Sequence, residues 1–155
     1  MTFCNFAFMK KLLIILACTL SPFLAKAQDG YYIQCEDTCN HIHGIDISHY
    51  QGQVFWEVIG ENSKMAYVYI KATEGGDRID PRYERNIELA HQYGLKVGSY
   101  HFFRPKTSLK KQLDNFMMQC RPADQDLIPM IDVETKSGLP TPEFCDSLTK
   151  FIALV

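Results

Sequence analysis

The chain has 155 residues, which suits one domain with a core large enough to be stable without disulfides. Hydrophobic residues make up 46% of it and charged residues 22%, an ordinary balance for a globular protein. The net charge of -2 gives no basis for nucleic acid or an acidic membrane surface as a partner, so we expect neither.

Residues 1–27 have the pattern of a signal peptide. Lys10-Lys11 forms a basic start, residues 12–20 form an apolar stretch, and Ala25-Lys26-Ala27 is a small-x-small cleavage site. The pattern predicts export to the periplasm or the extracellular space, with no stable membrane insertion after cleavage. An alternative is lipid attachment at Cys18, because the apolar residues before it faintly resemble a lipoprotein cleavage site.

Export changes how the cysteines are interpreted. Four remain after cleavage, namely Cys35, Cys39, Cys120 and Cys145. In an oxidising compartment they allow three pairings, among which the sequence does not choose. A bridge between Cys35 and Cys39 that fixes the mature N-terminus is one plausible arrangement.

A polar lead-in over residues 28–42 precedes a domain over residues 43–155. The predicted strands are 44–48, 65–73, 96–103 and 127–134, and the predicted helices are 54–59, 80–93, 107–120 and 141–152. Asp80-Pro81 and Thr141-Pro142 each predict a helix that starts with a capping residue followed by proline. Strand followed by helix, four times over, predicts right-handed crossovers and a parallel sheet.

Polar or aromatic residues end every predicted strand, and this favours a barrel over a doubly wound sheet. They are Asp46 and Ser48, Lys71 and Glu74, Tyr100 and His101, and Asp132 and Glu134. The C-terminal ends of parallel strands converge on one mouth, where barrel active sites lie. We therefore expect an α/β fold of the TIM-like (β/α) barrel type. An eight-stranded barrel takes about 250 residues, so we expect this one to be truncated after its fourth unit.

The stretch from Pro129 to Glu134 is a short apolar run that ends in two carboxylates. In a strand, the period of two places Asp132 and Glu134 on one face. Such a pair taken alone is more often a solvated strand end, but the converging strand ends favour an active site. Neighbouring carboxylates push their pKa values apart, so that one can donate a proton while the other stays ionised. We expect Glu134 to be the acid, and we expect Lys71 to keep Asp132 ionised.

Four separate motifs resemble glycoside hydrolase family 25, the lysozymes of the N,O-diacetylmuramidase type. The motifs are Gly44-Ile-Asp-Ile-Ser-His-Tyr-Gln-Gly52, Tyr69-Ile-Lys-Ala-Thr-Glu-Gly75, Gly98-Ser-Tyr-His-Phe102 and Ile131-Asp-Val-Glu134. The resemblance covers residues 43–155. It implies an irregular, partly open barrel that cleaves the β-1,4 bond between N-acetylmuramic acid and N-acetylglucosamine in peptidoglycan. We expect a monomer that uses no cofactor and no metal.

The resemblance also implies a role for each matching residue. Glu134 matches the general acid, Asp132 matches the carboxylate that acts as nucleophile or assists the substrate's acetamido group, and Asp46 matches an acid on the first strand. Five further residues match positions around the cleft, namely Tyr69, Lys71, Glu74, Tyr100 and His101. Family members usually continue through more strands, with a Trp-Gln-Tyr segment and another acid, so the resemblance leaves the activity of this chain open.

Several of these residues also have purely structural interpretations. Tyr69 and Tyr100 fit a core, Glu74 fits a turn, and a lone histidine such as His101 is more often a hydrogen-bonded structural residue. We expect the single tryptophan, Trp56, to pack on the apolar side of its helix.

Two other functions start from different features of the sequence. A metal-dependent hydrolase would use His41 and His43 with Asp46 and His49, although both leading histidines precede the strand and fall at the wrong end of a barrel. A non-catalytic peptidoglycan-binding remnant is the other alternative.

Overall fold

The computed structural model describes residues 41–155, which form one compact unit. The predicted signal peptide, nearly all of the lead-in, Cys18, Cys35 and Cys39 lie outside the described residues. Within the described part, Cys120 is buried and Cys145 is exposed, and the two are not joined to each other. No helix between residues 41 and 155 is long and apolar enough to cross a membrane.

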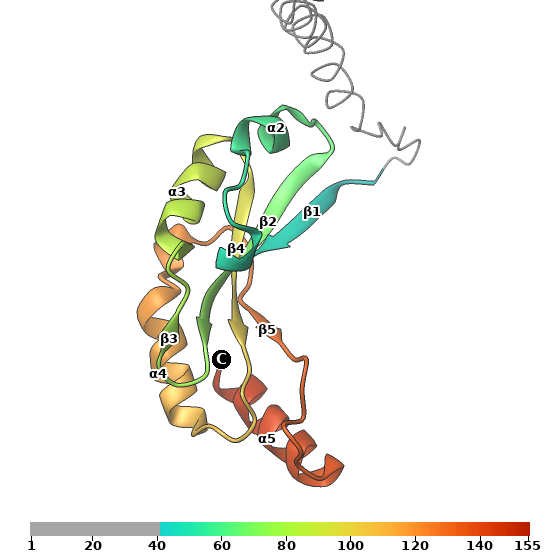
Figure 1. Ribbon diagram of the computed structural model, residues 1–155, viewed down its shortest axis with the longest axis vertical. Coiled ribbons are helices and arrows are strands. Elements are labelled where there is room, and N and C mark those ends of the chain that lie inside the picture. Colours follow the sequence, from blue (N-terminus) through green and yellow to red (C-terminus); the bar gives the residue numbers. More distant parts are fainter. Residues whose placement is uncertain (1–40) are drawn as a thin grey trace, which may run out of the picture. The chain divides into compact units, whose positions relative to one another are not determined.

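Four parallel strands form a curled sheet in the order β1-β2-β4-β5 (Figure 1). These strands are β1 (His43–Ile47), β2 (Met65–Glu74), β4 (Lys96–Phe102) and β5 (Met130–Asp132), and β3 (Arg78–Ile79) pairs antiparallel with the end of β2. Four α-helices lie between or after them in the described part, namely α2 (Trp56–Glu61), α3 (Tyr83–Gln92), α4 (Leu109–Gln119) and α5 (Thr141–Leu154). Short 3-10 helices lie at η1 (His49–Gln51) and η2 (Pro122–Asp124). The α/β fold, with its sheet curled into part of a barrel, is confirmed.

The helices cover one face of the sheet and leave the other open. Figure 1 shows α3 and α4 along the same side, with α5 near the end toward which β2 and β4 run. The Ser108 hydroxyl caps α4 by accepting from the Lys111 amide at 3.5 Å. The apolar stripe of α4 then buries Phe116 and Cys120 against the sheet.

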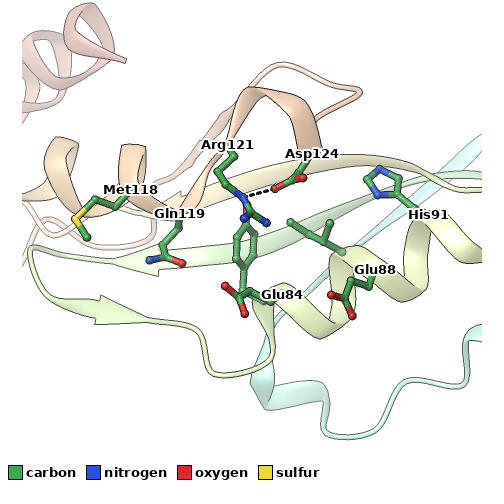
Figure 2. A pocket seen from close by; sticks show the side chains of 9 residues that line it. Glu84, Glu88, His91, Met118, Gln119, Arg121 and Asp124 are labelled. Atoms are coloured by element: carbon green, nitrogen blue, oxygen red, sulfur yellow. Dashed lines mark hydrogen bonds and ion pairs between the residues drawn. The ribbon is translucent and has the colours of Figure 1, made fainter.

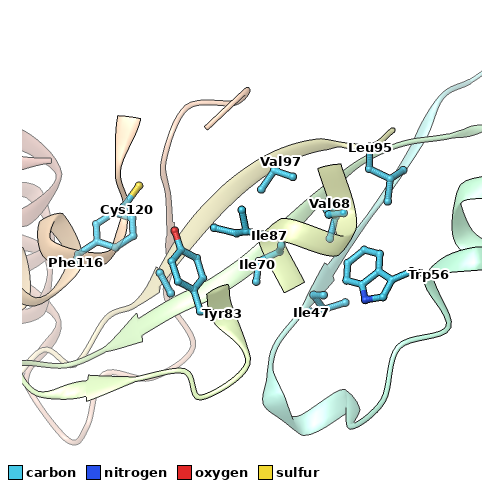
Figure 3. Close-up of a cluster of buried hydrophobic side chains, with 12 residues drawn as sticks. Ile47, Trp56, Val68, Ile70, Tyr83, Ile87, Leu95, Val97, Phe116 and Cys120 are labelled. Carbon is cyan, nitrogen blue, oxygen red and sulfur yellow. The ribbon is translucent and has the colours of Figure 1, made fainter. Parts of the chain in front are cut away.

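The hydrophobic core lies between these helices and the sheet (Figure 3). Val68 and Ile70 of β2 and Val97 of β4 are fully buried and belong to one cluster with Ile87 of α3. Trp56 of α2 is 2% exposed and packs in the same cluster, so the prediction that it is a packing residue is confirmed. The alternation of apolar residues along β2 is what commits this face to the core.

The predicted start of α3 is wrong by a few residues. Asp80 does not cap the helix, which begins at Tyr83. Its buried carboxylate instead accepts hydrogen bonds from the backbone amides of His49 (2.9 Å) and Arg82 (3.0 Å). The same carboxylate binds His49 Nδ1 at 2.7 Å, so Asp80 connects η1 to the turn before α3. A buried aspartate needs such partners, and this long-range need outweighs the local capping pattern.

The predicted last strand is too long. Only Met130–Asp132 pair with β4, because the amides of Asp126 and Leu127 both donate to the Val97 carbonyl and hold the chain in a turn beforehand. Glu134 therefore lies beyond the strand and is exposed. The shared-face argument for the two acids does not apply, because only Asp132 belongs to the ladder.

Candidate functional site

The open face of the sheet carries most of the predicted site residues. Strand register aligns Asp46 with Tyr69, Lys71 with Tyr100, and Phe102 with Asp132. Partners in register share a face, and so do residues two apart on one strand. We call this set the site face, and it consists of Asp46, Tyr69, Lys71, Glu74, Tyr100, Phe102 and Asp132.

A bulge in β2 places Glu74 on the site face. The register shifts between Lys71 and Thr73, so that Thr73 aligns with His101 and Glu74 with Phe102. Lys71 and Glu74, three residues apart, consequently face the same way and bind each other. A regular alternation along β2 would place Thr73 on the same face as Lys71, but the bulge turns Thr73 to the helix side instead.

Tyr69 lies flat across the neighbouring strand. A Cβ atom at Gly98 would overlap the Tyr69 ring, so only glycine allows this close approach. The Tyr69 hydroxyl donates a 3.1 Å hydrogen bond to the Ile128 carbonyl, just before β5. Tyr69 thus bridges β2 and the segment that leads to Asp132.

Tyr100 lies between two of the predicted catalytic acids. Burial raises the pKa of the Tyr100 phenol, and the nearby carboxylates of Asp46 and Asp132 raise it further, while a hydrogen bond with Ser48 opposes them. Tyr100 is therefore a neutral hydrogen-bond donor at physiological pH. Asp46 of β1 and Asp132 of β5 thus both lie near enough to Tyr100 to act on the pKa of its phenol.

The pKa of Asp132 is raised above its ordinary value. Burial raises its pKa most, the Glu134 carboxylate raises it next, and Asp46 adds to the effect. Lys71 acts in the opposite direction, as predicted, but it does not prevail. Lys71 therefore favours the ionised form of Asp132, in the direction that we expected, while burial and the Glu134 charge act against it.

Glu74 holds three cations at the end of β2. Its Oε2 accepts from Lys71 Nζ at 2.8 Å, and its Oε1 accepts from Arg78 Nη1 at 2.8 Å and Arg104 Nη2 at 2.6 Å. Burial alone would raise its pKa, but the hydrogen bonds from Lys71 and Arg104 outweigh burial and lower the pKa to about 2. Glu74 is thus ionised and fully engaged with side chains of the chain itself, beyond the simple turn residue that we considered.

His101 does not lie on the site face. It is completely buried, with Nδ1 hydrogen-bonded to Thr73 Oγ1 (2.8 Å) and Nε2 to Gln112 Oε1 (3.1 Å). Phe116 and Phe151 pack against its ring. The expectation that His101 contacts substrate is wrong here, because adjacent strand residues face opposite ways and Tyr100 occupies the open side.

Two residues beside Lys71, namely Phe102 and Arg104, were not predicted from the sequence as parts of the site. The Phe102 ring lies under Lys71 Nζ, 4.6 Å from the ring centroid, and under the Arg104 guanidinium at 4.5 Å. Alternation from Tyr100 would have placed Phe102 on the site face. Arg104 follows the strand and has no comparable signal in the sequence.

Comparison with known proteins agrees with this geometry. The sequence model of "Glycosyl hydrolases family 25" matches residues 45–155. The chain belongs to this family.

Individual relatives of family 25 cover part of the chain. Lysozyme M1 of Streptomyces globisporus is 42% identical over 67 residues, which is 43% of this chain and 22% of that protein. The N,O-diacetylmuramidase of Arthroderma benhamiae is 34% identical over 102 residues, 64% of this chain and 43% of that protein. The bacterial lysozyme structure from Streptomyces coelicolor superimposes with a TM-score of 0.65 and 33% identity, covering 76% of this chain and 58% of that one. The chain therefore spans about half, or less, of the length of the proteins it matches.

The alternative metal site does not assemble in this family 25 chain. His41 and His43 lie at the start of β1, whereas Asp46 lies near its end. His49 binds Asp80. Between residues 41 and 155, no three His, Cys, Asp or Glu side chains are grouped as a metal ion would require.

A separate hollow of about 450 Å³ lies on the helix side of the family 25 fold (Figure 2). Its lining comes from α3, the C-terminal end of α4 and the η2 segment, and includes Glu84, Glu88, His91 and Arg121. Arg121 there binds Asp124 at 2.6 Å. None of the predicted site residues lines this hollow.

Proposed function

We propose that this chain acts as a lysozyme that hydrolyses the β-1,4 bond between N-acetylmuramic acid and N-acetylglucosamine in peptidoglycan. The observation that carries the proposal is the strand register, which aligns Asp46 with Tyr69, Lys71 with Tyr100 and Phe102 with Asp132 on the open face of the parallel sheet. Membership of family 25 and its named lysozymes and muramidases supports it. The domain would span residues 43–155.

Glu134 is our choice for the general acid. It is exposed beyond β5, so its carboxyl group is free to meet the leaving oxygen of a glycan that lies across the mouth. Its charge acts on Asp132, so the two acids form an interacting pair. Glycoside hydrolysis requires one acid to protonate the leaving oxygen and the other to stabilise the positive charge that develops at the anomeric carbon.

Asp132 would be the partner of the acid, either as the nucleophile that attacks the anomeric carbon or as the carboxylate that orients the substrate's acetamido group. Its partly buried side chain lies on the site face, at the end of β5.

Tyr69, Lys71, Glu74 and Tyr100 would surround the substrate. Of these, Tyr100 keeps its hydroxyl proton at neutral pH, so it would act as a hydrogen-bond donor to the substrate. Glu74 acts indirectly, since Lys71, Arg78 and Arg104 occupy its carboxylate oxygens. The proposed partner is peptidoglycan, the proposed compartment is outside the cytoplasm, and the proposed state is a monomer.

The test is a cell-wall digestion by the full chain with analysis of the new chain ends. Purified peptidoglycan is incubated with the protein, reduced with borohydride and hydrolysed, and the reduced amino sugars are identified. We expect muramitol, because the bond is cut on the reducing side of N-acetylmuramic acid. Reduced glucosamine would contradict the bond assignment. Pelleting with peptidoglycan without new reducing ends would favour the non-catalytic binding function.

A further inference from the structure

A surplus of positive charge lies beside the acids of the site face. Lys71, Arg78 and Arg104 all bind the single carboxylate of Glu74. Three cations and one anion leave this cluster with a formal charge of +2. Such a surplus at the mouth of the sheet would attract an anionic group on a ligand.

The two arginines are held in place but keep unused donors. Arg78 is 72% exposed and uses only Nη1 to bind Glu74, while Arg104 is 39% exposed and uses Nε and Nη2. A guanidinium carries five N–H groups, so both side chains retain donors that no described residue accepts. Because Glu74 already holds both arginine side chains, little side-chain entropy would be lost when they bind a ligand.

A hollow of about 420 Å³ opens next to these donors. Its lining includes Arg78, Arg104, Lys106, Asp77 and Ser137. Lys106 is exposed and has no ion-pair partner among residues 41–155, and Asp77 is the only acid of the lining other than Glu74. Ser137 comes three residues after Glu134, so the hollow adjoins the loop that carries the proposed acid.

We propose that this hollow is a subsite for a carboxylate group carried by the glycan strand, bound by Arg78 with Lys106 and Arg104. Arginine binds carboxylates through two parallel N–H groups, which suits the free edge of Arg78. The inference rests on the proposed function, because peptidoglycan carries a free lactyl carboxylate on each muramic acid without a peptide, and carboxylates on the peptides where that lactyl group is amide-linked. The two sources are the lactyl ether of muramic acid and the attached peptide.

The experiment measures the equilibrium affinity of the full chain for three oligosaccharides. The first alternates N-acetylglucosamine and N-acetylmuramic acid with free lactyl groups, the second is the same glycan with its peptides, and the third is uncharged chitotetraose. The variants are Arg78→Gln and Lys106→Gln. Arg85→Gln, an exposed residue of α3 with no partner among the described residues, removes the same charge elsewhere and serves as the control.

We expect each site variant to bind at least one carboxylate-bearing glycan about tenfold to hundredfold more weakly, the size of one hydrogen bond to a charged group. Chitotetraose affinity should stay unchanged, and Arg85→Gln should match the parent throughout. A loss confined to the peptide-free glycan identifies the lactyl group, and a loss confined to the peptide-bearing glycan identifies the peptide.

Other outcomes overturn the proposal. If both variants bind the charged glycans like the parent, the hollow is not a carboxylate subsite. If they lose chitotetraose equally, the hollow binds sugar and not carboxylate. Failure of the parent to bind any of the three glycans would overturn the proposed function, and this subsite with it. Lys106→Gln removes no contact within the described part, so it tests the subsite even if Arg78→Gln destabilises the fold.

Discussion

Lys71 donates a 2.8 Å hydrogen bond to Glu74, and both side chains are almost completely buried. The bulge in β2 makes this pair possible, because it places residues three apart on the same face of the strand. The pair anchors the site face, since Glu74 in turn holds Arg78 and Arg104.

Replacement of Glu74 by Gln should destabilise the fold strongly. The change leaves Lys71 buried without its counter-charge, and loss of one partner of a buried ion pair typically costs about 3 kcal/mol or more. The free energy of unfolding, from urea titration at neutral pH, measures the effect. Asp146→Asn is the matched control, because its pair with Lys150 is exposed and should contribute roughly 0.5 kcal/mol or less.

The Lys71–Glu74 pair also makes the stability of the fold depend on pH. Glu74 has a folded pKa of about 2 against an ordinary value of 4.5. A depressed pKa gives stability that is present above pH 4.5 and is lost as the pH falls toward 2. The difference in the free energy of unfolding between the parent and Glu74→Gln should therefore shrink as the pH falls from 4.5 toward 2. A gap that stays constant over the window would show that Glu74 is not held in its ionised form.

Asp132→Asn should stabilise the protein at neutral pH while it impairs catalysis. The folded pKa of Asp132 is raised above 3.8 by burial and by Glu134, so the ionised group costs stability as the pH rises past 3.8. Removal of one like charge should contribute roughly 1 kcal/mol or less. Thermal unfolding at neutral pH and below pH 3.8 tests this prediction, because the gain should vanish in acid. Lower stability of the variant at neutral pH would contradict it.

The parallel sheet and the core could be predicted from the hydrophobic periodicity of the sequence. Apolar alternation places Val68 and Ile70 in the core, and the helix periods place Phe116 there too. The site was harder to predict, because its geometry depends on exceptions to those patterns. Nothing local to β2 indicates the bulge that turns Thr73 away, and nothing near Asp80 indicates its partner 31 residues earlier, at His49.

One error was avoidable from the sequence alone. Tyr100 and His101 are neighbours on a strand, so only one of them can face the open side. The structure assigns that side to Tyr100 and buries His101 among α4 and α5 side chains. The strand period thus already excluded one of the two.

His101→Phe should lower stability and reduce its dependence on pH. The change removes the partner of Thr73 and Gln112, and unpaired buried polar groups cost about 1–3 kcal/mol. Burial lowers the folded pKa of His101 below 6.5, so the unfolded chain takes up a proton first and the parent loses stability as the pH falls through 6.5. Urea titrations above and below pH 6.5 should show that the parent and the variant differ less in their free energy of unfolding in acid. His91→Gln, at an exposed site, is the control, and a gap that widens in acid would contradict the prediction.

Glu134→Gln should abolish most turnover while the chain still binds peptidoglycan. The amide keeps the shape of the side chain but has no proton to give to the leaving oxygen, and a general acid contributes about 10²–10⁴-fold to the rate. Glu143→Gln, an exposed glutamate in the first turn of α5, makes the same chemical change outside the site and should leave the rate unchanged. Release of reducing ends measures the rate, and pelleting with insoluble peptidoglycan measures binding. Because Glu134 is exposed and lies beyond β5, unfolding should not account for the loss, and equal thermal stability of the two variants would establish this point. A Glu134→Gln variant that digests cell walls at the parent rate would remove Glu134 from the role of acid and leave Asp132, with its raised pKa, as the candidate.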